Sequence, residues 1–414
     1  MTAPARRDVV ILGMLSTFGP LSLDLYLPAL PSLAAELEAS TSAAQLTLTS
    51  CLVGLAVGQL IAGPLSDRFG RRPPLIIGLL AYALASLLCA FAWTVSVLIV
   101  FRLVQGLAGA AGLVIARAVA RDLYEGRRLA MFFSRLVLIS GLAPVIAPVL
   151  GGQLNLVMSW RGIFGVLGVI GIILLAAGMF GVPETLPASR RVRGGLGTTL
   201  RGFRALFRDR FFLGVALASG LAGASMFAYI AGATFVLQRI YGLSPQGFSL
   251  AFGVNSLGIM AAAQVSARLI RRWSPMRILA FGLLVNLAGS LSLLTSVLLN
   301  LGLPFLLVSL FVMVSAIGLV LPNATALGLS GHADQAGTAS ALLGLLQYVI
   351  GGLVLPLVGV AGEETAVPLG LVAATVSASA CTVFGLLVVR SVLADRRAAE
   401  AREAASQEPP LTTG

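Results

Sequence analysis

The chain has 414 residues, of which 58% are hydrophobic and only 11% are charged, and its mean hydropathy is +0.98. A soluble domain carries about 25% charged residues, so this composition excludes a soluble globular protein and indicates one with several membrane spans. The net charge of +12 does not indicate nucleic-acid binding. The basic residues are all arginines, and they recur in short clusters between apolar runs, as they do in membrane-protein loops.

Twelve apolar segments are long enough to cross ~30 Å of hydrocarbon, which takes about 20 helical residues. The sequence shows no sustained alternation with period two, so helices are expected rather than barrel strands. The first segment follows Arg6 and Arg7 like a signal peptide, but its length, Asp24 and Pro28 favour a retained span. The expected spans are 9–30, 44–66, 74–93, 96–119, 131–154, 161–183, 211–238, 247–270, 275–297, 303–328, 337–360 and 367–390.

A polar, arginine-rich connector divides these spans into two sets of six. A basic turn between spans 8 and 9 matches the one between spans 2 and 3, a weak internal symmetry expected of transporters built from repeats. The expected domains are an N-terminal six-helix bundle (1–185), a cytoplasmic linker (186–210), a C-terminal six-helix bundle (211–390) and a disordered cytoplasmic tail (391–414). With the N-terminus in the cytoplasm, all but three of the 28 arginines fall on the cytoplasmic side, which favours two cytoplasmic termini.

Span 1 contains Asp24, the one acidic residue predicted well inside a span. A carboxylate in hydrocarbon is costly, so it tends to face a cavity or a partner, and it can load and release a proton there. Arg102 is the corresponding basic residue in span 4, and both residues are expected ~9 Å below the outer boundary. We hypothesise that they share one polar cavity and are coupled electrostatically, directly or through water. The alternatives are an interfacial Asp24 and an Arg102 that extends outward to the membrane surface.

Other polar and aromatic residues within the spans are candidates for the wall of a central cavity. Each is equally consistent with a helix-packing contact, because polar side chains also join helices in membranes. The candidate cavity residues are Tyr26, Gln105, Phe227, Tyr229, Asn255, Asn323 and Gln347.

Between spans 2 and 3 lies the pattern Gly-x-x-x-Asp-Arg-x-Gly-Arg-Arg. Its acidic residue could face a helix N-terminus, where partial positive charge favours an anion, and its arginines could bind other helix ends or lipid phosphates. We predict that these contacts hold one conformation of a rocking protein, a role beyond that of a positive-inside anchor. The residues of the pattern are Gly63, Asp67, Arg68, Gly70, Arg71 and Arg72.

Span 5 combines prolines one turn apart with a glycine pair. Proline removes a backbone donor and kinks a helix, and glycine allows close helix contact in lipid. A bent, closely packed helix is therefore expected, although glycine and proline are also common in ordinary membrane helices. The residues concerned are Gly141, Pro144, Pro148, Gly151 and Gly152.

The sequence lacks the residues of several other functions. No phosphate-binding G-x-x-x-x-G-K-S/T pattern is present, so ATP-driven transport by this chain is not expected. One histidine and three cysteines within apolar runs provide no metal spacing, no disulfide framework and no catalytic triad. We therefore expect no enzyme activity, no metal and no cofactor.

The patterns above belong to longer segments at 23–31, 58–72, 102–106, 117–124, 143–152 and 160–164, with weaker ones at 322–326 and 336–341. Together they resemble the major facilitator superfamily, in its twelve-span drug:proton antiporter branch, and are most similar to the Bcr/CflA group of multidrug efflux proteins. The resemblance covers nearly the whole chain. It implies an all-α membrane fold with two six-helix bundles around a central cavity and both termini in the cytoplasm.

The resemblance also implies roles for particular residues. The loop 63–72 would stabilise the outward-open state, with Asp67 facing the start of span 11 near Gly337. Arg102 would take part in proton coupling. Span 5 would be the antiporter motif, although Ala143-Pro144 replaces the Gly-Pro pair of its strictest form, as in the Bcr/CflA group.

The expected function is proton-coupled efflux of small amphiphilic drugs by alternating access, giving multidrug or bicyclomycin- and chloramphenicol-type resistance. The protein would act as a monomer in the bacterial cytoplasmic (inner) membrane, with drug, protons and the lipid bilayer as partners and the proton gradient as energy source. A nearly uncharged cavity with one acidic residue fits neutral or monocationic amphiphiles. The alternative functions are an exporter or a proton symporter for one small metabolite or sugar.

Overall fold

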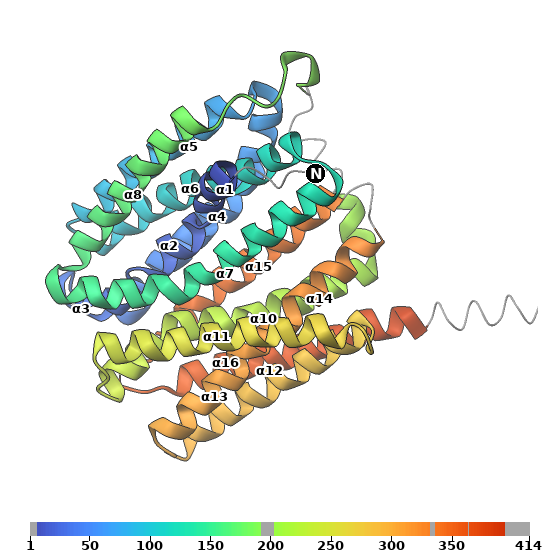
Figure 1. Cartoon of the computed structure of the whole chain (residues 1–414). Coiled ribbons are helices and arrows are strands. Elements are labelled where there is room, and N and C mark those ends of the chain that lie inside the picture. The colour runs from blue at the N-terminus through green and yellow to red at the C-terminus, as the bar shows by residue number, and fades with distance from the viewer. Residues whose placement is uncertain (1–5, 192–202, 332–335, 363, 394–414) are drawn as a thin grey trace, which may run out of the picture.

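The computed structural model describes residues 6–191, 203–331, 336–362 and 364–393, and in these residues the chain is helical without a strand (Figure 1). The first group of helices comprises α1 (Arg6–Ser16), α2 (Phe18–Asp24), η1 (Leu27–Ala29), α3 (Leu30–Glu36), α4 (Thr41–Phe69), α5 (Arg72–Ala90), α6 (Val95–Leu123), α7 (Gly126–Val157) and α8 (Trp160–Gly181), followed by the turn η2 (Ala188–Arg190).

The second group begins with α10 (Arg210–Phe235), which continues as a π-helical turn, η3 (Val236–Ile240). It then comprises α11 (Pro245–Leu269), α12 (Pro275–Leu298), α13 (Leu303–Ser315), α14 (Ile317–Ser330), α15 (Ala336–Val358) and α16 (Val367–Val383), with a final π-helical segment, η5 (Phe384–Val389). Each group packs mainly on itself, and Figure 1 shows the two groups as two stacks of helices. The groups meet chiefly where α4 packs on α15 and α7 packs on α11.

Local sequence signals set the helix starts. The hydroxyls of Ser40, Thr94, Ser244 and Ser274 each accept a hydrogen bond from the backbone N–H three residues later, at the starts of α4, α6, α11 and α12. Such caps satisfy N–H groups that the helix itself leaves without an acceptor. Several helices also begin with proline, whose missing N–H costs nothing there.

Helices α4 and α6 approach closely because glycines line their contact. A Cβ atom on Gly54 or Gly58 would overlap the backbone of α6, and a Cβ atom on Gly106 would overlap the backbone of α4 near Cys51. Small residues of this kind let helix backbones meet in a membrane. The close contact fixes Arg102, on α6, against α4.

Ten helices of the described residues are long and apolar enough to cross a membrane. The expected span 5 falls within α7, whose apolar part, Leu142–Val157, is shorter. The all-helical membrane fold is therefore confirmed, whereas the number twelve and the cytoplasmic termini stay predictions. The domain limits at 185, 210 and 390 also stay predictions, and residues 192–202 of the linker and 394–414 of the tail lie outside the described residues.

Span 1 is not the continuous helix 9–30 that the sequence predicted. Its two parts, Val9–Ser16 and Leu21–Glu36, meet at 45°, and α2 ends at Asp24 before the chain resumes in η1 and α3. Proline explains both interruptions. Pro20 has no N–H for the carbonyl of Ser16, and Pro28 has none for the carbonyl of Asp24.

Candidate transport cavity

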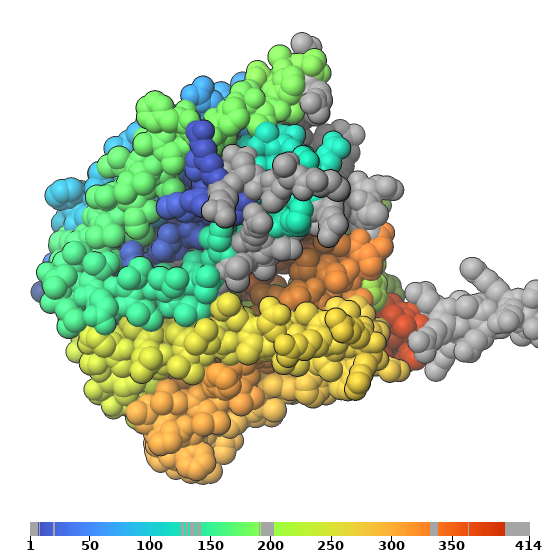
Figure 2. Space-filling model, viewed as in Figure 1, coloured from blue at the N-terminus to red at the C-terminus, as the bar shows by residue number. Residues whose placement is uncertain are grey.

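The two groups of helices are joined by hydrogen bonds at the end of the molecule where α3 lies. The hydroxyl groups of Ser42 and Thr49, on α4, donate to the carbonyl oxygens of Pro356 and Gly352, on α15, at 3.0 Å each. The Gln246 side chain of α11 donates to the carbonyl of Gly152, on α7, at 2.9 Å. Figure 2 shows α7, in teal, packed against α11, in yellow. The structure is therefore closed at this end.

Towards the opposite end, a cavity of about 320 Å³ separates α4 and α6 from the start of α15. Its wall carries charged and polar side chains from both groups of helices. They include Gln59, Asp67, Arg71, Arg117, Arg121, Asp122, Thr338 and Ser340. The end of the molecule with the basic loop at 68–72 is thus the open end.

Asp24 lies at the interruption of the first span, as the last residue of α2. Its side chain is buried, with 5% of the residue exposed, and it has no hydrogen bond or ion pair within the part of the chain that the structure describes. It is close enough to the phenol groups of Tyr229, on α10, and Tyr348, on α15, to interact with them electrostatically. Asp24 is thus a buried, unpaired acid that interacts electrostatically with the second group of helices.

Arg102 is fully buried within the first group of helices. Its Nε donates to the carbonyl of Thr47 at 3.3 Å, and its Nη1 donates to Gln105 Oε1 at 2.5 Å. The guanidinium carbon lies 4.6 Å from the ring centre of Tyr26 and 5.5 Å from that of Phe164. These contacts hold Arg102 in a packed polar cluster rather than at the membrane surface.

The expected coupling of Asp24 with Arg102 is not made by direct contact. No ion pair joins them. Span 1 continues through α3 to Glu36 instead of ending at Leu30, and the expected equal depth of the two residues stays a prediction. The structure connects them through Tyr26, which follows Asp24 by two residues and contacts Arg102.

The predicted cavity residues fall into separate places, and none of them lines the 320 Å³ cavity. Tyr26 and Gln105 belong to the Arg102 cluster, where Gln105 also donates to Ser86 at 2.7 Å. Asn323 donates to Ser266 Oγ at 2.7 Å and joins α14 to α11. Helix packing therefore engages these three side chains, the alternative that sequence reasoning left open.

The other predicted cavity residues belong to the second group of helices. Tyr229 receives a hydrogen bond from Asn255 Nδ2 at 2.8 Å and interacts electrostatically with Asp24. The ring of Phe227 lies 6.2 Å from that of Tyr348. Gln347, next to Tyr348 in the chain, is partly buried against Gly223.

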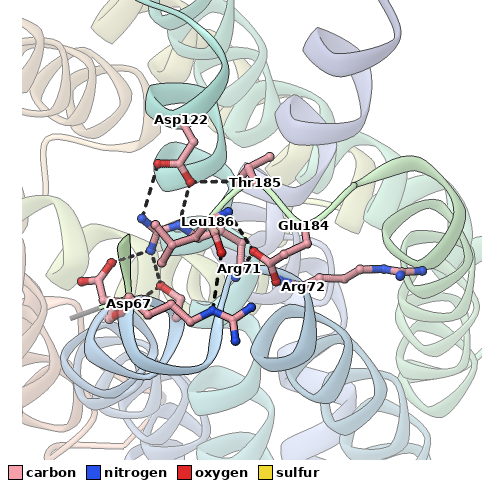
Figure 3. Close-up of polar contacts among 10 residues, drawn as sticks. Asp67, Arg71, Arg72, Asp122, Glu184, Thr185 and Leu186 are labelled. Carbon is pink, nitrogen blue, oxygen red and sulfur yellow. Dashed lines mark hydrogen bonds and ion pairs between the residues drawn. The ribbon is translucent and has the colours of Figure 1, made fainter. Parts of the chain in front are cut away.

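The basic pattern at 63–72 is mostly helical, because α4 continues to Phe69. Gly70 makes the turn with φ +93°, a conformation that favours glycine. Figure 3 shows Arg71 at the centre of the contacts. It donates to Asp122 Oδ2 at 2.8 Å, to Ser66 at 2.9 Å and to Asp67 at 2.5 Å. Asp67 is thus paired with Arg71 of its own half, across the cavity from Thr338 near the start of α15.

Two further arginines of the pattern make different contacts. Arg72 donates to the carbonyl of Met179 in the last turns of α8, at 2.8 Å, in line with the expected binding to helix ends. Arg68 lies over the ring of Phe69, with its guanidinium carbon 5.2 Å from the ring centre. Gly63 is within α4 and lines the cavity.

Sequence reasoning missed the acidic partners of this pattern, Glu184 and Asp122. Glu184 accepts hydrogen bonds from the backbone N–H groups of Arg71 at 2.8 Å and Arg72 at 3.2 Å (Figure 3). Asp122 binds Arg71 and accepts from the hydroxyl of Thr185 at 2.8 Å. A usable signal was present, since each acid directly follows an apolar span.

The charges of this cluster stabilise one another. Burial disfavours the charged form of Arg71, but its bonds to Asp122 and Asp67 outweigh burial and raise its pKa above the ordinary value. Partial burial also disfavours the Glu184 carboxylate, but the N–H groups of Arg71, Leu186 and Arg72 lower its pKa below the ordinary value. Arg71 and Glu184 are therefore both charged at neutral pH.

Replacement of Glu184 by glutamine is expected to weaken the attachment of the 70–72 turn to α8. Glutamine cannot accept both N–H groups as a carboxylate does, so we expect a loss of about 1 kcal/mol at pH 7. Because folding lowers the pKa of Glu184, its contribution is present above the unfolded pKa of about 4.3 and disappears as pH falls through the folded pKa. Thermal unfolding of the purified wild type and variant at pH 7 and pH 4 measures the stability that Glu184 contributes.

The control for Glu184→Gln is Glu125→Gln, at an exposed acid whose side chain makes no capping hydrogen bond. The control should unfold like the wild type at both pH values. An equal loss for Glu184→Gln at pH 7 and pH 4 would contradict the assignment.

Helix α7 contains all five residues of the predicted bend, and it lies at the contact between the two groups. Pro148 has no N–H for the carbonyl of Pro144, and this oxygen instead accepts from Ser256 of α11 at 3.2 Å. A Cβ atom on Gly151 would overlap the carbonyl oxygen of Leu25, and one on Gly152 would overlap the hydroxyl of Ser249. The close packing is thus observed at these positions, while the bend itself, including the role of Gly141, stays a prediction.

A helical membrane body with a polar cavity between two groups of helices is the architecture expected of a transporter. The sequence matches the family model of the Major Facilitator Superfamily over residues 12–356. The chain belongs to this superfamily, as the sequence motifs predicted, and is a multi-pass protein of the bacterial cytoplasmic membrane.

Curated relatives cover most of the chain. An uncharacterized MFS-type transporter, YdgK of Bacillus subtilis (strain 168), is 42% identical over 364 residues, which is 87% of this chain and 90% of that protein. A bicyclomycin resistance protein homolog of Haemophilus influenzae is 30% identical over 87% of this chain and 91% of its own length. A chloramphenicol resistance protein of Pseudomonas aeruginosa is 32% identical over 69% of this chain and 67% of its own length.

Solved structures show the same fold. The crystal structure of a mutant of the nucleoside transporter NupG superimposes with a TM-score of 0.75, covering 92% of this chain and 98% of NupG at 13% identity. At that identity the likeness concerns the fold alone.

Proposed function

We propose that this chain exports small amphiphilic drugs in exchange for protons, by alternating access between its two groups of helices. Relatives named for bicyclomycin and chloramphenicol resistance support drug efflux. The observation that carries the proton coupling is Asp24, a buried acid without hydrogen bond or ion pair among the described residues, at the interruption of the first span. An intramembrane acid of this kind is suited to bind and release a proton.

The proposed cycle uses the two ends of the molecule in turn. The basic end faces the cytoplasm by the positive-inside rule, so the cavity beside Asp67 opens inward and the end near α3 is closed outward. Drug enters this cavity, and the groups rock to open the other end. Protonation of Asp24 from outside then favours drug release, and its deprotonation towards the cytoplasm resets the protein. The proton gradient is the energy source, and one chain supplies the whole cavity, which fits a monomer.

Arg102 acts in this proposal as a positioning residue. It bonds the carbonyl of Thr47 on α4 and packs on Tyr26, which lies two residues beyond Asp24. It thereby fixes the irregular segment between α2 and α3 against α4 and α6. Asp67, Arg71 and their acidic partners at the open end exchange contacts when the two groups move.

Everted membrane vesicles test the direction and the coupling. Respiration acidifies the vesicle interior, and addition of chloramphenicol or bicyclomycin should partly dissipate the pH gradient as drug enters and protons leave. Vesicles without the protein provide the control. A drug that instead moves out of the vesicles together with protons would indicate a symporter, and would refute the proposed exchange.

A further inference from the structure

The cavity at the open end contains a cation that the sequence-based picture of a nearly uncharged cavity did not include. Arg117, on α6, lines this cavity and is exposed, two residues before the end of the span expected at 96–119. It has no hydrogen bond or ion pair in residues 6–191, 203–331, 336–362 and 364–393. An exposed guanidinium without a protein partner is available to bind an incoming anion.

Neighbouring groups leave Arg117 without a counter-charge. Asp67 and Asp122 line the same cavity, but both bind Arg71. Arg121, one turn further along α6, adds a second positive charge to the wall and interacts unfavourably with Arg117. The cavity wall therefore has a positive balance on its α6 side.

A second hydrogen-bond donor of the same cavity is also free. Gln59 Nε2, on α4, is buried and has no hydrogen-bond partner in the described part of the chain. A buried amide without an acceptor costs free energy that an incoming acceptor group would recover. Gln59 and Arg117 come from α4 and α6, the two helices whose glycines bring them into close contact.

The second group of helices supplies the opposite wall. Thr338 and Ser340, near the start of α15, lie across the cavity from α4 and α6. Leu60 on α4 and Val114 and Ala118 on α6 add apolar surface to the lining. The cavity thus combines two free donors with an apolar surface.

We propose that Arg117 and Gln59 form a subsite for a carboxylate group, and that the protein accepts amphiphiles carrying one. This inference rests on the proposed efflux function and names a substrate class for it. The guanidinium plane presents paired donors that match the two oxygens of a carboxylate. Gln59 supplies a further donor. The apolar part of the ligand packs on Leu60, Val114 and Ala118. Neutral and monocationic amphiphiles, expected from the sequence, would lack this anchor.

Binding of a matched pair of probes tests the subsite directly. The probes are 4-phenylbutyrate and its uncharged amide, titrated calorimetrically into the purified full-length protein in detergent at pH 7.5. The wild type should bind the carboxylate at least tenfold more tightly than the amide, and Arg117→Gln should abolish this preference. Arg117→Lys should keep part of it, because the charge remains but the paired donors do not.

Two further variants keep the test decisive. Arg268→Gln makes the same change at an exposed arginine that does not line the cavity, and it should bind both probes like the wild type. Gln59→Leu should weaken carboxylate binding several-fold and leave amide binding unchanged, even if Arg117→Gln fails to fold. A wild type without preference for the carboxylate, or a preference that survives in Arg117→Gln or is unchanged in Gln59→Leu, overturns the proposal.

The outcome is distinguishable from a failure of the proposed function. Equilibrium binding in detergent requires neither a proton gradient nor transport. A carboxylate preference lost in Arg117→Gln would support the subsite even if everted vesicles showed no drug-dependent proton movement. Conversely, drug–proton exchange without any carboxylate preference would support efflux and refute the subsite.

Discussion

Vesicles containing Asp24→Asn are expected to show no drug-dependent loss of the pH gradient, although the variant folds and binds drug. Asparagine has nearly the shape of aspartate but cannot take up a proton at physiological pH. Because Asp24 has no hydrogen bond or ion pair among the described residues, the substitution breaks no contact that the fold depends on. The expected defect is therefore confined to coupling.

The size of the effect follows from the energy of one proton. One pH unit supplies about 1.36 kcal/mol, and one charge crossing 100 mV supplies about 2.3 kcal/mol. Exchange of one proton for one neutral drug could thus sustain a drug gradient of about 500-fold, because 1.4 kcal/mol corresponds to tenfold. In Asp24→Asn this gradient should fall to that of vesicles without the protein.

The matched control for this substitution is Glu364→Gln, at an exposed acid between α15 and α16. It should keep wild-type exchange. Wild-type drug-dependent proton movement in Asp24→Asn would show that another group carries the proton, and the proposed mechanism would then be wrong.

Arg102→Ala is expected to destabilise the protein by about 3 to 5 kcal/mol, because it empties a packed site and leaves buried acceptors without donors. Arg102 is fully buried, and its guanidinium bonds Gln105 and Thr47 and packs on Tyr26. Thermal unfolding of the purified variant should show a clear fall in Tm. Transport should fail with it, since the segment that carries Asp24 loses its support.

Arg102→Met separates packing from charge. Methionine fills much of the same volume, so it avoids most of the cavity, but it leaves the acceptors on Gln105 and Thr47 without this donor. We expect Arg102→Met to lose about 1 to 3 kcal/mol, less than Arg102→Ala. The control Arg268→Ala, at an exposed site, should stay within about 0.5 kcal/mol. Unchanged stability of Arg102→Ala would contradict the packed cluster described here.

Much of the architecture could be predicted from the sequence alone. Apolar runs of about 20 residues separated by arginine clusters leave helices as the way to satisfy the backbone in lipid. The close packing at Gly151 and Gly152, and the contact of Arg72 with a helix end, also followed from local chemistry. These features depend on a residue and its immediate neighbours in the chain.

The partners of the charged residues could not be predicted in this way. Arg71 binds Asp122 with its side chain and Glu184 with its backbone N–H. These two acids lie 51 and 113 residues from Arg71 in the chain. The shape of the first span also depended on tertiary information, because the chain continues beyond its proline interruption to Glu36. The contact of Gln105 with Arg102 follows from their spacing of three residues on one helix. The rotation of α6 decided that Arg117 faces the cavity.

The sequence by itself determined a helical membrane body, its basic end and the identity of its intramembrane acid, because hydrophobicity and charge act through solvation residue by residue. Only the tertiary structure decided which charges are paired and which are free. Pairing depends on how α4, α6 and α15 are rotated against one another, and that rotation is set by glycine contacts between helices distant in the chain. For this reason the sequence identified Asp24, whereas only the helix packing showed that the donors of Arg117 and Gln59 are free.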